Sequence, residues 1–155
     1  MVVFKSFSKT SLWQSSEGRG PRIAAVRAVE AQYRNEFYRA FTSLLGYGVG
    51  ISSEWSHDDS KGRVDFRILD PKWGVELLRN GTKETLKQHY ERFLPNGRYY
   101  QWISDGSITD WLVIDCRVST PTPGEYSKLA SLLHLWVMPL IVISATWTET
   151  MVCRV

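Results

Sequence analysis

The sequence has little cysteine, little net charge and no long apolar run at its N-terminus, and each of these excludes a class of protein. Cys116 and Cys153 are its only cysteines, too few for the disulfide framework of a small secreted domain. The formal net charge is only +3, which permits a nucleic-acid partner without demanding one. Lysines and serines interrupt residues 1–16, so the apolar segment of a secretory signal peptide is missing. An organellar transit peptide stays open as an alternative.

What the sequence does have is the apolar content of a folded domain. Hydrophobic residues make up 43% and aromatic residues 13% of the 155 residues, which argues against disorder and is enough for one core. Cys116 lies in an apolar run and is interpreted as a buried thiol. We therefore expect a reducing, intracellular compartment, with the nucleus as one candidate. The predicted organisation is a flexible N-terminal arm over residues 1–20, an α/β domain over 21–128 and an apolar extension over 129–155.

Residues 61–100 carry most of the functional information. They predict a hairpin whose strands, Arg63–Leu69 and Trp73–Leu78, are separated by a turn at Pro71-Lys72. After Asn80-Gly81, a helix is predicted to begin at Thr82 or Lys83 and to run to Phe93.

The rest of the chain predicts a helix and two more strands around this hairpin. Apolar residues at three- and four-residue steps predict a helix over Arg22–Leu45 that ends at Gly46. Two further strands are predicted, over Tyr47–Trp55 and over the apolar run Asp110–Val118. Residues 96–106 are interpreted as turns. The predicted fold class is α/β: a helix packed on a mixed central sheet of about four or five strands, in the order α-β-β-β-α-β.

The apolar tail, Leu129–Trp147, allows three interpretations. Its length would permit a membrane-spanning helix. Pro139 and the β-branched residues Ile141–Ile143 favour one or two buried strands of the same domain, so we do not expect a membrane partner. A diverged or frameshifted end is the third interpretation.

Two acidic residues stand in the middle of the predicted hairpin strands. Asp65 and Glu76 both have apolar neighbours, and an unpaired carboxylate there is costly. One interpretation is that each strand simply shows a polar face. The other is that two carboxylates from adjacent strands bind a divalent cation through oxygen, Mg²⁺ or Mn²⁺.

Four short motifs in this order resemble a known family. The strings EAQY and EFYR (Glu30–Tyr33 and Glu36–Arg39) precede GRVDFRILDPKWGVELLRNG, and HYERF (His89–Phe93) follows. Over about residues 28–123 the chain resembles the fungal domain at the C-terminus of Crinkler-type proteins, and more broadly the PD-(D/E)XK, or restriction-endonuclease-like, nuclease superfamily.

This resemblance implies a magnesium- or manganese-dependent nuclease core acting on DNA, with no small-molecule substrate. Asp65 and Glu76 would hold the metal, and either Glu30 or Glu36 from the first helix would assist. The family's lysine two residues after the glutamate is missing, because Leu78 stands there. His89 and Arg92, on the following helix, are the candidates to replace it.

The basic residues Arg63, Arg67, Lys72 and Arg98 are the candidate DNA-phosphate contacts.

Each of these helix residues also has a purely structural interpretation. Glu30 could be a rim carboxylate paired with Arg34 or with Arg27, His89 a hydrogen-bonded core residue, and Arg92 half of a surface ion pair with Glu91 or Asp105. If these hold, the domain is a catalytically inactive effector or toxin-like module that binds nucleic acid or a host protein, or a structural remnant of a mobile-element protein. Leu78 in place of lysine favours the inactive module.

Overall fold

The structure, a computed structural model, describes residues 3–8, 10–12, 22–57, 62–117, 140–145 and 151–154. The chain forms two compact units, Met1–Val49 and Gly50–Val155. Each is described by itself.

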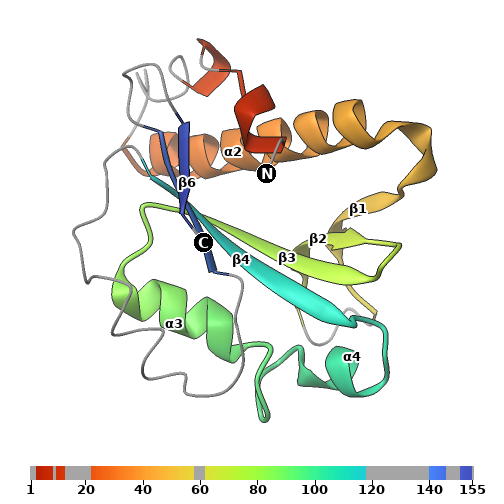
Figure 1. The fold of residues 1–155 in the computed structure, drawn as a ribbon. Coiled ribbons are helices and arrows are strands. Elements are labelled where there is room, and N and C mark those ends of the chain that lie inside the picture. Colours follow the sequence, from red (N-terminus) through yellow and green to blue (C-terminus); the bar gives the residue numbers. More distant parts are fainter. Residues whose placement is uncertain are drawn as a thin grey trace. The chain divides into compact units, whose positions relative to one another are not determined.

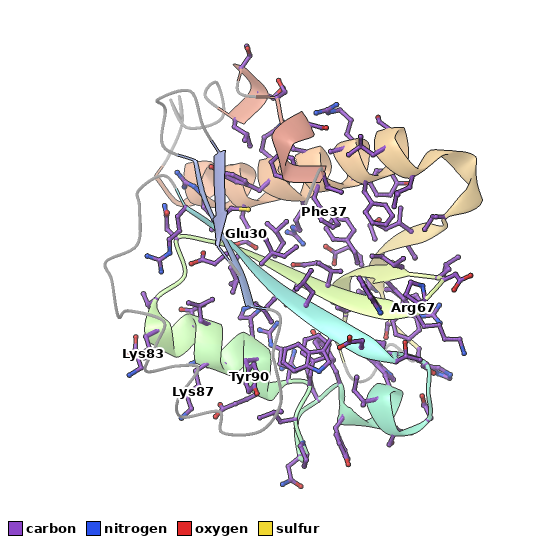
Figure 2. The ribbon with its side chains drawn as sticks, in the orientation of Figure 1. Glu30, Phe37, Arg67, Lys83, Lys87 and Tyr90 are labelled. Carbon is purple, nitrogen blue, oxygen red and sulfur yellow. The ribbon has the colours of Figure 1, made fainter. Side chains whose placement is uncertain are left out.

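The first unit is built on the long helix α2 (Arg22–Leu45), which confirms the predicted helix residue for residue. Along its described part, Tyr33, Phe37, Ala40 and Phe41 are buried at three- and four-residue steps, and the rings of Phe37 (Figure 2) and Phe41 lie 5.8 Å apart. Gly46 follows with a φ of 68°, a left-handed conformation that glycine adopts freely and that ends a helix.

Two short 3₁₀ helices complete the first unit. The helix η1 (Val3–Ser6) lies inside the segment predicted to be a flexible arm. The helix η2 (Gly46–Gly48) corrects the prediction of a strand from Tyr47, because a stretch with glycine at every second position has few side chains to pack in a sheet. The strand β1 begins only at Ile51.

The second unit is a mixed β-sheet with helices on it, which confirms the predicted α/β class. The strands are β1 (Ile51–Trp55), β2 (Val64–Ile68), β3 (Trp73–Arg79), β4 (Asp110–Arg117), β5 (Leu140–Ala145) and β6 (Met151–Arg154). They lie side by side in sequence order. Pairing is parallel between β3 and β4 and between β4 and β5, and antiparallel elsewhere. Figure 1 shows β3 and β4 running together through the middle of this unit.

Two helices connect β3 to β4, where one was predicted. The helix α3 (Lys83–Glu91) matches the prediction, although it ends two residues before Phe93. The helix α4 (Tyr100–Ser104) occupies residues interpreted as turns. Trp102 of this helix stacks on the adjacent Tyr99 at 4.8 Å and also packs edge-on against Trp55 of β1 at 5.1 Å. The contact with Trp55 is tertiary packing, which helical periodicity cannot show. The described order from α2 to β4 is α-β-β-β-α-α-β.

Both helices share one hydrophobic core with the sheet, and in Figure 1 they lie on the same side of β3 and β4. The buried members of this core are Val64, Leu78, Leu86, Phe93, Tyr99, Trp102, Ile108 and Val113. The Trp111 ring of β4 stacks on Phe93 at 4.6 Å and meets the edge of Tyr90 of α3 at 5.0 Å. Burying a side chain of this size contributes about 1.5–3 kcal/mol, so α3 is fixed firmly against β4.

The strands β5 and β6 fall inside the predicted apolar extension. They agree with its interpretation as strands of the same domain, whereas residues 129–139 and 146–150 lie outside the described residues. Within the part of the chain that the structure describes, no helix is long and apolar enough to cross a membrane.

Among the described glycines of the second unit, Gly97 makes the closest backbone approach, and it generates a stability prediction. A Cβ at this position would lie 2.1 Å from the carbonyl oxygen of Glu91 and 2.4 Å from that of Arg92, a clash with backbone that no rotamer change relieves. We expect Gly97→Ala to lower the free energy of unfolding by about 1–3 kcal/mol, as overpacking does. Gly48→Ala is the control, because its Cβ would meet nothing within 4 Å. Equal denaturant midpoints for both variants would contradict this packing.

Candidate functional site

The centre of the candidate site is Glu76, a buried carboxylate in the middle of β3. Side chains alternate along a strand, so Glu76 shares a face with Gly74 and Leu78. That face looks toward the helices, since a Cβ on Gly74 would lie 3.2 Å from Phe93 and 3.0 Å from Ile108. Glu76 is only 2% exposed. A carboxylate so removed from water needs compensating cations or hydrogen-bond donors.

The helix α3 supplies them. Oε2 of Glu76 lies 2.7 Å from Nδ1 of His89 and 2.9 Å from a terminal guanidinium nitrogen of Arg92. Residues three apart on a helix share a face, and the same nitrogen of Arg92 is 3.1 Å from Nδ1 of His89. The two residues proposed from sequence therefore meet the proposed glutamate. The observed partner of Arg92 is therefore Glu76. The structural interpretation had been a surface ion pair with Glu91 or Asp105.

The contact with Glu76 fixes the orientation of the His89 ring. When the Glu76 carboxylate is ionised it only accepts hydrogen bonds, and Nδ1–H is then the donor to Oε2. In the neutral imidazole, Nε2 then carries the lone pair. The His89 side chain is 18% exposed and that of Arg92 28%, so both are partly accessible from solvent.

The second oxygen of Glu76 is differently placed. Among the described atoms, Oε1 is buried and has no hydrogen-bond partner, an arrangement that stores a desolvation cost of about 1–3 kcal/mol or more. Burial first, and then the charge and the side-chain contact of nearby Glu76, raise the pKa of the Tyr99 hydroxyl far above its ordinary value. That hydroxyl stays protonated and donates to the carbonyl oxygen of Arg63 at 2.6 Å.

Asp65 reaches the same stretch of β3 from the neighbouring strand. The last paired residues of β2 and β3 are Phe66 and Val75, so the register brings Asp65 opposite Glu76 one step further on. Oδ2 of Asp65 accepts the main-chain N–H of Leu77 at 2.8 Å. This side-chain oxygen takes the place of the main-chain carbonyl that would accept the N–H in a regular sheet. The hydrogen bond holds the Asp65 carboxylate against β3, beside Glu76.

A second buried acid positions the helix that carries His89 and Arg92. Asp115 of β4 is 0% exposed and accepts the N–H of Gly81 at 2.9 Å and Nε of Arg117 at 2.6 Å. Arg117 in turn donates to the Gly81 carbonyl at 2.6 Å. Thr82 then caps α3 by accepting the N–H of Thr85. The sequence signal for this clamp is an acid in an apolar strand with arginine two residues later, on the same strand face.

The two first-helix acids lie in the first unit, where each has partners of its own. Glu30 is half-exposed and 4.0 Å from Arg34, which agrees with a rim carboxylate. Glu36 is buried, and its Oε2 accepts from the main-chain N–H of Ser8 and from Arg39, both at 2.7 Å. This pairing ties the N-terminal segment to α2, a role that sequence reasoning missed.

The four predicted phosphate-binding residues all lie in the second unit. Arg67 (Figure 2) donates to the carbonyl of Ser107 at 3.0 Å and stacks over the Trp55 ring at 4.7 Å. Lys72 donates to the Gly106 carbonyl at 3.4 Å. The side chains of Arg63 and Arg98 are exposed.

In the described residues, no group of three or more histidine, cysteine and acidic side chains is arranged to hold a metal ion. Comparisons of the chain with protein-family models, with curated proteins and with solved structures found no match. The function must therefore be argued from the Glu76 site itself.

The buried ion pair of Glu36 generates a pH prediction. Burial is the largest single influence on this carboxyl and opposes ionisation, but the Arg39 and Ser8 hydrogen bonds and the Arg39 charge together hold the pKa of Glu36 below its ordinary 4.5. A depressed pKa stabilises the fold above the unfolded pKa, and that contribution is lost as the pH falls through the folded pKa.

We expect Glu36→Gln to lower stability at about pH 7 and to narrow the gap to wild type near about pH 3, measured by urea unfolding. Glu30→Gln, at a half-exposed site, is the control. A wild-type advantage over Glu36→Gln that stays constant with pH would contradict the pairing.

Proposed function

We propose that the chain is a metal-dependent nuclease-like domain that hydrolyses phosphodiester bonds of DNA. The observation that carries the proposal is the buried Glu76 of β3, with His89 and Arg92 reaching it from the next helix. A strand carboxylate beside a second acidic strand residue, with cationic groups from the following helix, has the composition of a phosphoryl-transfer site. The restriction-endonuclease-like core and the Crinkler-type resemblance belong to the same proposal.

The donor set fits a magnesium ion in one respect that can be checked. Mg²⁺ keeps several waters and is commonly bound through one or two carboxylates, and the buried Oε1 of Glu76 has no partner among the described atoms. Asp65 and Glu76, both in the second unit, would hold the ion. When bound, the ion would polarise the scissile phosphate and lower the pKa of a coordinated water.

Arg92 and His89 would act on the phosphate and the water. A guanidinium that keeps one nitrogen on Glu76 has further N–H groups for a phosphate oxygen, where negative charge grows in the transition state. His89, held through Nδ1, would present Nε2 to orient or accept a proton from the attacking water. This assignment gives the helix the role that lysine would have at the position of Leu78.

Substrate binding would draw on the basic side chains of the second unit. Arg63 and Arg98 are exposed, and Arg67 and Lys72 lie between them in the chain. Phosphate contacts of this kind release counterions, so DNA affinity should fall steeply with salt.

The second candidate function is an inactive module that binds nucleic acid or a host protein. Leu78 is buried in the core in place of a lysine, and the Arg92 guanidinium already neutralises Glu76. A carboxylate that is satisfied by an internal cation has less to gain from a metal. Measurements of metal binding and of DNA cleavage distinguish the nuclease from the inactive module.

Metal binding is the first test. Magnesium or manganese should raise the melting temperature by mass action, by the equivalent of about 2.7 kcal/mol at a concentration of about 100 Kd. Glu76→Gln should abolish this increase, measured by calorimetry. Glu91→Gln is the control, because Glu91 is exposed and pairs with Lys87. An increase that survives Glu76→Gln would place the ion elsewhere.

Cleavage is the second test. In a plasmid-nicking assay with magnesium, Arg92→Ala and His89→Ala should each lower the rate by about 10²–10³-fold, as losing one transition-state donor does. DNA affinity should change much less, because other phosphate contacts supply most of it. Lys87→Ala is the control, since Lys87 lies on the outer side of α3 (Figure 2) and is 63% exposed. A wild type that binds DNA but never cuts under either metal would favour the inactive module.

A further inference from the structure

A hollow of about 740 Å³ lies beside the α3–α4 connection and shares Arg98 with the candidate DNA-phosphate contacts. Its lining includes Gly62, Asn96, Arg98, Tyr100, Gln101 and Ser104. We propose that it binds an unpaired nucleotide of a single nucleic-acid strand, which would make the preferred substrate single-stranded or frayed. This inference rests on the proposed function for its biological meaning, but its test does not require cleavage.

The backbone around the hollow has a fixed, unusual course. Asn96 and Gly62 have φ values of 73° and 94°, and Gly97 packs directly on the carbonyls that end α3. The N–H of Tyr99 donates to the carbonyl of Arg92 at 2.7 Å. The loop is therefore folded back on α3, which gives the hollow defined walls before any ligand binds.

The charge of the lining favours an anion. Arg98 contributes a positive charge, and none of the described residues that line the hollow is acidic. The Arg98 side chain lies along Gly62, with a guanidinium nitrogen only 3.1 Å from where a Cβ would be. A guanidinium held in this way binds a phosphate with less loss of side-chain entropy than a free one.

Tyr100 supplies the surface for a base. It is 40% exposed, whereas its neighbours Tyr99 and Trp102 are buried in the core. Bases of a single strand stack on such rings without regard to sequence, and polar side chains such as Asn96, Gln101 and Ser104 can meet the edges of a base. In a duplex the base faces are covered by stacking, so this combination selects an unpaired nucleotide. The volume lies in the range of small-ligand sites, about 300–1,000 Å³.

The hollow adjoins the Glu76 site through the backbone. Arg98 and Tyr100 flank Tyr99, whose hydroxyl donates to Arg63 next to Gly62, and whose N–H is bonded to Arg92. A strand with one nucleotide in the hollow would pass its neighbouring phosphates near His89 and Arg92. The hollow would thus select the strand, and the Glu76 site would act on it.

The test is fluorescence anisotropy with labelled single-stranded DNA, single-stranded RNA and duplex DNA of equal length, in EDTA so that no metal-dependent step occurs. Tyr100→Ala should weaken single-strand binding by about 5- to 150-fold, the loss expected for one stacked base, and leave duplex binding nearly unchanged. Tyr100→Trp should retain single-strand binding. Tyr38→Ala, at a tyrosine 43% exposed on α2, is the control, and melting temperatures verify that each variant folds.

Four outcomes overturn the inference: no single-strand binding by wild type, an unchanged affinity in Tyr100→Ala, an equal loss for duplex, or a free mononucleotide that competes as well as the whole strand. The last result would make the ligand a free nucleotide. If the wild type never cleaves DNA but prefers single strands in a Tyr100-dependent way, the nuclease proposal is wrong and the single-strand site is supported. If the protein cleaves DNA but Tyr100→Ala leaves single-strand affinity unchanged, the nuclease proposal is supported and the single-strand site is wrong.

Discussion

The buried carboxylate of Glu76 links the strand and the helix that form the candidate site. A carboxylate this far from water must be compensated, and the compensating groups come from a different element, α3, through His89 and Arg92. Those contacts require α3 to start at a fixed point, which the Asp115–Arg117–Gly81 clamp provides. The sheet, the turn after β3 and the helix are therefore linked by two buried acids, one at each end of the same connection.

Sequence patterns predicted the elements whose causes are local. The spacing of Tyr33, Phe37 and Phe41 gave the bounds of α2, and alternation gave β2 and β3. The helix α4 is packed through Trp102 against Trp55 of β1, and no short window of sequence contains both of these residues. The strand β1 begins at Ile51 and not at Tyr47 as predicted, because the glycines at 46, 48 and 50 favour a turn over a strand.

The candidate site was predictable in part, for the same reason. Strand parity put Asp65 and Glu76 at neighbouring positions, and helix spacing put His89 and Arg92 on one face of α3. Their bonding could not be predicted, because it depends on how far α3 lies from β3. The same holds for Glu36: its acidic type suggested a metal ligand, whereas its partners Ser8 and Arg39 come together only after the chain has folded back.

The Arg92 contact has opposite effects on the two properties that a nuclease needs. A guanidinium on Oε2 makes burial of Glu76 tolerable and places a donor where a phosphate would lie, but it also competes electrostatically with any second cation. The unpartnered Oε1 reduces this competition, since a metal can approach one oxygen while Arg92 keeps the other. Under the proposed function, such a site would bind metal weakly until the negative charge of a substrate phosphate joins it. Metal and nucleic acid should therefore each raise the affinity for the other.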